Sequence, residues 1–269
     1  MTNATQRPER VVILCGGRGY RMETETDLRP KPMITIGDRP VLWHIMKIFS
    51  HFGYYRFVLA LGYKGDVIRD YFLHYHEYHQ DFILTLGENT RVEHQAPSDE
   101  PWEIVFAETG VNTTTGGRLL AVRKYLDTPE FLMTYGDGVS DVDLDAVRAL
   151  HERGGRLATV TAVPPASRFG ELDIEGEVVR GFSEKPLRSA LRINGGFFVL
   201  NQGALDYIHG DEFFEQAPLM RLAQEGQLGC YLHDGFWQCM DTPTERDHLN
   251  RLWAEGAPWR VWDQGSDTA

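Results

Sequence analysis

Cysteine is scarce in this sequence, with three residues in 269, at positions 15, 230 and 239. The odd number argues against a disulfide framework, and the spacing matches no cysteine motif of a metal site. We therefore expect a protein of a reducing compartment, the cytoplasm.

Long hydrophobic runs are missing as well. No apolar stretch approaches the roughly 20 residues that a membrane-spanning helix needs. The first ten residues, MTNATQRPER, are polar and lack the apolar core of a signal peptide. We therefore expect neither a membrane anchor nor a secretion signal.

Positive charge is also in short supply. The 27 Lys and Arg residues stand against 39 Asp and Glu residues, for a net charge of -12. This balance argues against nucleic-acid binding through a general basic surface. An acidic protein that binds an anion must concentrate its cations locally, and Arg18, Arg21, Arg29 and Lys31 do lie close together.

The sequence does contain a regular alternation of short apolar runs and amphipathic stretches. Runs typical of strands occupy 11–15, 55–61, 81–87, 102–109, 130–138 and 157–163. Helical periodicity occupies 40–52, 65–79, 114–126 and 141–155. This order predicts an α/β fold with a Rossmann-like, doubly wound, mostly parallel (mixed) sheet and helices on both faces. Ligands of such folds bind at the carboxyl ends of the strands.

The character of the chain changes from Phe169 onward. Short strands with intervening turns are expected at 169–174, 178–186 and 195–200, and helices at 202–210 and 213–226. We interpret this part as a smaller subdomain, about 166–262, that folds onto the sheet of about 10–165. The ends, 1–9 and 263–269, are expected to be flexible tails.

The glycine-rich stretch GGRGYR, residues 16–21, directly follows the first predicted strand. Backbone N–H groups in such a loop bind phosphate oxygens. A Walker A loop is excluded, since no Gly-Lys-Ser/Thr is present. A dinucleotide fingerprint is disfavoured, because Met22 replaces its third glycine and Pro30 and Pro32 interrupt the helix it requires. A nucleotidyltransferase triphosphate loop and a plain glycine turn with solvated arginines remain open.

Two aspartates are candidates for a magnesium site. Asp137 lies between two glycines at the end of a predicted strand, and Asp241 precedes a Thr-Pro helix start. Mg²⁺ prefers one or two carboxylates together with substrate phosphates and water. The competing interpretations are a turn aspartate at 137 and a neighbour of a helix cap at 241.

Two further stretches carry polar groups. Glu184, Lys185 and Asn194 are candidates for binding a phosphate and hydroxyls, although Glu184 and Lys185 alone would more commonly be a surface ion pair. HYHEYH, residues 74–79, contains three histidines, but no second ligand cluster accompanies them. We therefore interpret these histidines as structural rather than zinc-binding.

Taken together, the motifs resemble the sugar-1-phosphate nucleotidyltransferases, and within that family the cytidylyl branch. The matching stretches extend from about Arg10 to Trp262, and they are GGRGYR, KPMITIG, LWHIMKIFSHFG, LGYKGDVIRDYF, EPWEIVFAETG, TGGRL, FLMTYGDGVSDVD, FGELDI, EKP, INGGFFVLN and GFWQCMD. TGGRL and YGDGV are more specific than the glycine loop, because they distinguish cytidylyltransferases from thymidylyl and uridylyl relatives. The resemblance implies one nucleotidyltransferase domain over 10–262.

The resemblance also implies residue roles. The nucleotide would be bound by Gly16, Gly17, Gly19, Tyr20, Arg21, Lys31, Thr115, Gly117, Arg118 and Gly136, with Thr115, Gly117 and Arg118 near the cytosine. The sugar phosphate would be bound by Glu184, Lys185, Asn194 and Gly195. Mg²⁺ would be bound by Asp137 and Asp241, and catalysis would depend on Arg21, Lys31 and Asp137.

The implied reaction is Mg²⁺-dependent transfer of CMP from CTP to α-D-glucose 1-phosphate, giving CDP-glucose and pyrophosphate. A different sugar 1-phosphate and a non-catalytic nucleotide-sugar-binding protein are the alternatives. Homo-oligomers are common in this family, and 75–105 is the expected contact region. The chain departs from the family pattern at Tyr20, where a threonine is usual, so the details of triphosphate binding are open.

Overall fold

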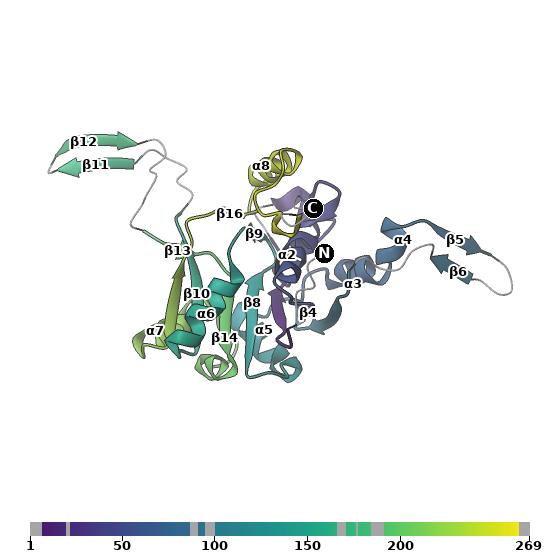
Figure 1. Cartoon of the computed structure of the whole chain (residues 1–269), viewed down its shortest axis with the longest axis horizontal. Helices are drawn as coiled ribbons and strands as arrows, with labels where there is room; N and C mark the ends of the chain where they lie inside the picture. The colour runs from purple at the N-terminus through teal and green to yellow at the C-terminus, as the bar shows by residue number, and fades with distance from the viewer. Residues whose placement is uncertain are drawn as a thin grey trace, which may run out of the picture.

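A computed structural model of the chain describes residues 7–19, 22–86, 91–94, 100–165, 171–175, 177–183 and 191–263. Its centre is a single mixed sheet of eight strands (Figure 1). The strand order is β13 (Ile193–Asn194), β10 (Ala158–Val163), β14 (Phe198–Asn201), β8 (Glu130–Tyr135), β1 (Val11–Leu14), β4 (Arg56–Leu61) and β7 (Glu103–Glu108), and β15 (Leu228–Leu232) also pairs with β10. The predicted fold class is confirmed.

The strands β8, β1, β4 and β7 form the parallel half of the sheet. Each is a nearly unbroken apolar run, as expected for a strand that is covered on both faces. Alternate side chains of β1 enter different cores: Val11 and Ile13 belong to one, Val12 and Leu14 to the other. The carboxyl ends of these strands all lie at one edge of the sheet, which is where the functional site is expected.

Helices cover both faces of the sheet. One core contains side chains of α2 (Val41–His51), α3 (Gly65–Leu73), α6 (Leu144–Gly154) and α8 (Pro243–Ala254). The other contains side chains of α5 (Thr115–Val122), α7 (Ala217–Gln224) and the 3₁₀ helix η4 (Gln202–Tyr207). The remaining short elements are α1 (Glu23–Thr26), α4 (Tyr75–His79), η2 (Lys31–Met33), η3 (Arg123–Tyr125) and η5 (Val261–Asp263).

The helix boundaries differ from the expectation in three places. The helix expected over 65–79 is two helices, α3 and α4, separated at His74. The segment 202–210 contains the 3₁₀ helix η4 rather than an α-helix. The helix expected from residue 213 begins at Ala217, because Pro218 has no backbone N–H and fits only the first turn of a helix.

The last third of the chain supplies strands to the central sheet. β14 lies between β8 and β10 and is antiparallel to both. β15 is parallel to β10 on the far side of that strand. These pairings join segments that are far apart in the sequence, so the sheet is complete only when the C-terminal part of the chain has been added.

Small two-stranded sheets complete the fold. β9 (Gly138–Ser140) pairs with β16 (Trp237–Cys239), and β2 (Thr35–Ile36) pairs with β3 (Arg39–Pro40). Two hairpins project from opposite sides of the molecule, β5 (Phe82–Thr85) with β6 (Arg91–His94) and β11 (Glu171–Glu175) with β12 (Val178–Ser183) (Figure 1). β6 was not expected, since its sequence is a polar stretch. Within the described part of the chain, no helix has both the length and the apolar character to cross a membrane.

Candidate active site

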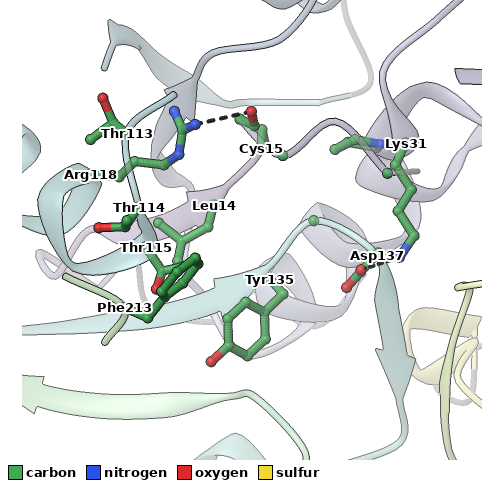
Figure 2. Close-up of a pocket in the computed structure, with 15 residues that line it drawn as sticks. Leu14, Cys15, Lys31, Thr113, Thr114, Thr115, Arg118, Tyr135, Asp137 and Phe213 are labelled. Carbon is green, nitrogen blue, oxygen red and sulfur yellow. Dashed lines mark hydrogen bonds and ion pairs between the residues drawn. The ribbon is translucent and has the colours of Figure 1, made fainter. Parts of the chain in front are cut away.

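A cavity of about 260 Å³ opens at the carboxyl ends of β1 and β8. Figure 2 shows Lys31 and Asp137 at one side of it and Arg118 with three threonines at the other. The lining residues are Leu14, Cys15, Gly16, Gly17, Gly19, Lys31, Pro32, Thr113, Thr114, Thr115, Arg118, Tyr135, Gly136, Asp137 and Phe213. The fold thus brings the glycine loop, Lys31, the start of α5 and the Gly-Asp turn around one space.

Lys31 lies between the two candidate metal carboxylates. Its Nζ donates to Oδ2 of Asp137 at 2.6 Å and to Oδ1 of Asp241. Burial alone would lower the pKa of Lys31, but the charges and hydrogen bonds of Asp137 and Asp241 outweigh it, so the pKa lies above its ordinary value. Lys31 therefore stays protonated at neutral pH and does not act as a proton donor or acceptor in catalysis.

The local structure explains why Asp137 and Asp241 meet. Asp137 follows β8 and precedes β9, whereas Asp241 follows β16, the partner of β9. Met240 N donates to Asp137 O at 2.9 Å, which places the two aspartates side by side. Thr242 then caps α8 in a capping box with Glu245, and this fixes the chain directly after Asp241.

The carboxylates of Asp137 and Asp241 are suitable ligands for a magnesium ion. Both carboxylates already share one cationic partner, the ammonium of Lys31, so their oxygens converge on a common centre. No group of three or more His, Cys, Asp and Glu residues in the described ranges could hold a metal by itself. Two converging carboxylates with the remaining positions left to phosphate and water are the set that Mg²⁺ prefers.

Arg118 is buried, with 4% of its surface exposed, and its guanidinium is held by backbone carbonyls. Nη1 donates to Leu61 O at 3.0 Å and to Gly110 O at 2.8 Å, and Nη2 donates to Gly16 O at 3.0 Å. Burial lowers the pKa of Arg118 from its usual value. The residue expected near the cytosine thus also ties the loops after β1, β4 and β7 together.

Gly16 has a clear steric reason to be glycine. A Cβ at this position would lie 2.0 Å from Nη1 of Arg118, which no real side chain tolerates. Gly19 has a different reason, since its φ of +63° lies in the left-handed region that favours glycine. The first glycine of the loop therefore admits the buried arginine, and the third allows the turn of the chain.

The N-terminus of α5 forms one wall of the cavity. Thr114 is its N-cap, and Thr115 Oγ1 donates to Glu215 Oε2 at 2.6 Å. A Cβ on Gly117 would lie 2.2 Å from Oδ1 of Asp211, so this glycine allows the segment before α7 to approach the helix. Unlike Thr115 and Arg118, Gly117 does not line the cavity.

Asn194 and Gly195 lie beyond the cavity, on β13 and directly after it. Asn194 Nδ2 donates to the hydroxyl of Tyr135 at 3.1 Å, and Tyr135 lines the cavity. Gly195 O accepts a hydrogen bond of 2.7 Å from Trp237 Nε1. Tyr20, Arg21, Glu184 and Lys185 lie outside the described residues.

Several lining residues were not expected from the sequence. Thr113 and Thr114 directly precede Thr115, and Tyr135 directly precedes Gly136, so proximity to a motif was an available signal. Phe213 had no such signal, because its segment has the pattern of a helix. Cys15 is completely buried beneath the loop, and burial raises the pKa of its thiol, so it is not a nucleophile here.

Comparison with known proteins gives consistent matches over nearly the whole chain. A sequence model of the nucleotidyl transferase family matches residues 10–240. The glucose-1-phosphate cytidylyltransferase of Salmonella typhi is 47% identical over 257 residues, which cover 94% of this chain and 100% of that protein. The probable glucose-1-phosphate cytidylyltransferase of Bacillus subtilis is 43% identical over 256 residues, with 94% and 100% covered.

Solved structures agree on the fold. HddC from Yersinia pseudotuberculosis has a TM-score of 0.64 at 23% identity, covering 91% of this chain and 99% of that one. Apo UDP-glucose pyrophosphorylase also has a TM-score of 0.64, at 14% identity, with 92% and 98% covered. At these identities the likeness concerns the fold alone.

Proposed function

Because this chain belongs to the nucleotidyl transferase family, we propose that it transfers CMP from CTP to α-D-glucose 1-phosphate, giving CDP-glucose and pyrophosphate. The observation that carries this substrate assignment is full-length identity of 43–47% to proteins named glucose-1-phosphate cytidylyltransferases. The cavity supports it, since the glycine loop, several hydroxyl groups, two buried cations (Lys31 and Arg118) and the carboxylate of Asp137 line the same space.

In the proposed reaction an oxygen of the sugar phosphate attacks the α-phosphorus of CTP. The new P–O bond forms as the bond to pyrophosphate breaks, and the electron pair leaves with the pyrophosphate. The attacking phosphate is already ionised near neutral pH, so no general base is needed. Catalysis then depends on orientation and on stabilising the developing charge.

The chain's own residues would supply these effects. Backbone N–H groups of Gly16, Gly17 and Gly19 would bind triphosphate oxygens, together with Tyr20 and Arg21. Lys31 would contribute a fixed positive charge, which its raised pKa supports. Thr115, Gly117 and Arg118 would border the cytosine, and Gly136 would let the nucleotide approach β8.

Asp137 and Asp241 would hold the magnesium ion. When bound there, Mg²⁺ would neutralise charge on the phosphates during the transfer. Arg21 and Lys31 would add positive charge around the same phosphates, so the acidic chain would meet its anionic substrates at a locally cationic site.

On the acceptor side we assign Glu184, Lys185, Asn194 and Gly195 to the sugar phosphate. Part of the chain, about 166–262, would thus serve the sugar, and about 10–165 the nucleotide. The hydrogen bond from Asn194 to the cavity-lining Tyr135 supports an acceptor position next to the nucleotide.

We further propose that the protein is a homo-oligomer with a contact region within 75–105. The hairpin of β5 and β6 supports this, because its apolar side chains are exposed: Ile83 by 54%, Leu84 by 49% and Val92 by 43%. Exposed apolar side chains on an isolated hairpin commonly mark a surface that another chain covers.

A substrate panel tests the assignment. The pure protein is incubated with Mg²⁺, glucose 1-phosphate and each of CTP, UTP, dTTP, GTP and ATP, and both pyrophosphate and nucleotide sugar are measured. CDP-glucose is expected as the main product. Absence of product with CTP, or equal product with UTP or dTTP, contradicts the proposal. A second panel of sugar 1-phosphates with CTP identifies the acceptor.

A further inference from the structure

Glu215 receives hydrogen bonds from two hydroxyls of the cavity wall. Tyr135 donates to its Oε1 at 2.7 Å, and Thr115 donates to its Oε2 at 2.6 Å. Tyr135 lies at the carboxyl end of β8, and Thr115 begins α5. One carboxylate therefore joins two walls that come from separate elements, although Glu215 itself does not line the cavity.

The same hydrogen-bond network continues to Asn194, which we assigned to the sugar phosphate. The hydroxyl of Tyr135 accepts from Asn194 Nδ2 at 3.1 Å. Asn194 Oδ1 in turn accepts from Gly196 N at 2.8 Å, which fixes the orientation of the amide. The direction of every bond is thus determined: Asn194 donates to Tyr135, and Tyr135 donates to Glu215.

The segment that carries Glu215 is itself firmly anchored. Asp211 accepts from the backbone N of Thr114 at 2.8 Å. Arg221 binds both oxygens of Glu212, at 2.7 and 2.9 Å. Phe214 N donates to Thr115 Oγ1 at 2.9 Å, so Thr115 both accepts from this segment and donates to it. Glu215 therefore projects from a fixed support.

These bonds define what the two hydroxyls present to a ligand. The single hydrogen of each hydroxyl is directed at Glu215, so Tyr135 offers its ring to the cavity and Thr115 its methyl group and remaining lone pair. A carboxylate is required for this, because it accepts two such bonds and donates none. Burial, and to a smaller extent the charge of Glu215, raises the pKa of Tyr135. The phenol therefore stays protonated and remains a hydrogen-bond donor.

We propose that Glu215 is a positioning residue that couples the nucleotide pocket to the sugar-phosphate subsite. It holds Thr115 and the Tyr135 ring against the nucleotide and, through Tyr135, holds Asn194 for the acceptor. A substitution of Glu215 therefore weakens the binding of both substrates, although Glu215 contacts neither of them. The inference rests on the proposed function, which assigns Asn194 to the sugar phosphate.

Steady-state kinetics of Glu215→Gln tests the coupling. Glutamine keeps the shape but places an N–H₂ group where one hydroxyl must donate. We expect KM for CTP and KM for glucose 1-phosphate each to rise about tenfold, the usual effect of one lost charged hydrogen bond. The value of kcat stays within about threefold, since no charge at the reacting phosphate is removed.

Glu225→Gln is the matched control. Glu225 accepts a hydrogen bond of 2.5 Å from the hydroxyl of Tyr207, which is the same chemistry outside the cavity. Its kinetic constants are expected to equal those of the wild type. Thermal unfolding of both variants is measured alongside, and the Tyr135→Phe variant, which keeps the ring, provides a second test should Glu215→Gln unfold.

The double variant Glu215→Gln/Tyr135→Phe completes a cycle. Coupling through Tyr135 predicts that it is no worse than the more impaired single variant. Additive effects overturn the inference, as do unchanged KM values or a fall in kcat alone. Absence of turnover by the wild type with every triphosphate refutes the proposed function instead, and the coupling is then judged by calorimetric titration of CTP in the four proteins.

Discussion

The ammonium group of Lys31 lies between two carboxylates. Its hydrogen bonds to Asp137 and Asp241 neutralise a pair of like charges that the fold brings close together. Without a cation between them, these carboxylates would repel one another. A metal ion that binds to the same oxygens must therefore compete with the ammonium group of Lys31.

Lys31→Gln is expected to change turnover and metal binding in opposite directions. Turnover falls by about 100-fold, because a charge beside the phosphates is lost. Binding of Mn²⁺ in the absence of nucleotide becomes about tenfold tighter, which corresponds to about 1.4 kcal/mol. Pyrophosphate release measures the first effect, and a paramagnetic resonance titration of free Mn²⁺ measures the second.

Lys124→Gln serves as the control for that pair of measurements. Lys124 lies over the ring of Tyr125, away from the cavity, so neither quantity should change. Mn²⁺ binding that is unchanged or weaker in Lys31→Gln would show that the lysine does not compete with the metal.

Arg118→Lys is expected to lower the free energy of unfolding by about 3 kcal/mol. A lysine cannot bridge the carbonyls of Leu61, Gly110 and Gly16 with a planar fork, so buried acceptors lose their donors. Urea unfolding measures the loss. Arg123→Lys, which affects a surface pair with Asp206, is expected to change the free energy by less than about 0.5 kcal/mol. Equal losses in the two variants would contradict the structural role of Arg118.

At the scale of elements, the connection between β15 and β16, residues 233–236, leads into the strand β16 that precedes Asp241. His233 Nε2 lies 3.0 Å from Asp141 Oδ1 and 3.1 Å from Phe236 O. Burial would lower the pKa of His233, but the hydrogen bond and charge of Asp141 outweigh it and raise that pKa. The protonated imidazole therefore stabilises this connection.

The sign of the pH dependence follows from that raised pKa. The contribution of His233 is complete below about pH 6.5 and is lost as the pH rises through the folded-state pKa. His233→Gln should thus lose more unfolding free energy at pH 6 than at pH 9, by about 1 kcal/mol. Urea unfolding of both proteins at the two pH values measures the difference.

His151 provides a control with the opposite trend. Burial lowers its pKa, so its neutral form is favoured in the fold, and its Nδ1 lies 2.9 Å from Thr159 Oγ1. The loss in His151→Gln should therefore be larger at high pH than at low pH. If the loss of unfolding free energy changed with pH in the same direction in both variants, the stabilising role of protonated His233 would be excluded.

An element was predictable from the sequence when its own residues determine its structure, and not when pairing with a distant segment is needed. β1, β4 and β8 were predictable, because each is a continuous apolar run that needs no partner to be recognised. β6 was not, since its polar residues form a strand only through pairing with β5. Glu215 was hidden for a related reason: its segment has helical periodicity, and only Pro218 marks the later start of α7.

The site was predictable to the extent that its residues carry motifs. Lys31, Asp137 and Asp241 were each candidates from the sequence, but their convergence depends on the pairing of β9 with β16. That pairing joins residues about a hundred positions apart, and no local pattern encodes it. The structural role of Arg118 was likewise not predictable, because its partners are backbone carbonyls rather than side chains.

For the molecule as a whole, two hairpins project from opposite sides (Figure 1), and only the hairpin of β5 and β6 lies within the proposed contact region. Leu84→Lys in β5 is expected to reduce the mass of the oligomer, since it places a charge in the proposed contact region. Light scattering coupled to size-exclusion chromatography measures the mass against the 30.7 kDa of one chain.

Val178→Lys is the matched variant on the other hairpin. Val178 in β12 is 51% exposed, close to the 49% of Leu84. Its mass should equal that of the wild type. A wild-type mass of one chain, or dissociation by Val178→Lys alone, would refute the contact region within 75–105.

The position of β14 between β8 and β10 has a consequence for synthesis on the ribosome. Both neighbours emerge before β14 does, so for a time each has an open edge that can pair with another chain. Such long-range pairing also makes folding slow. Because Asp241 emerges later still, a nascent or truncated chain has an incomplete sheet and lacks one of the two carboxylates proposed to bind magnesium. The segment 10–165, proposed to bind the nucleotide, is therefore not a fragment that can be separated and studied alone.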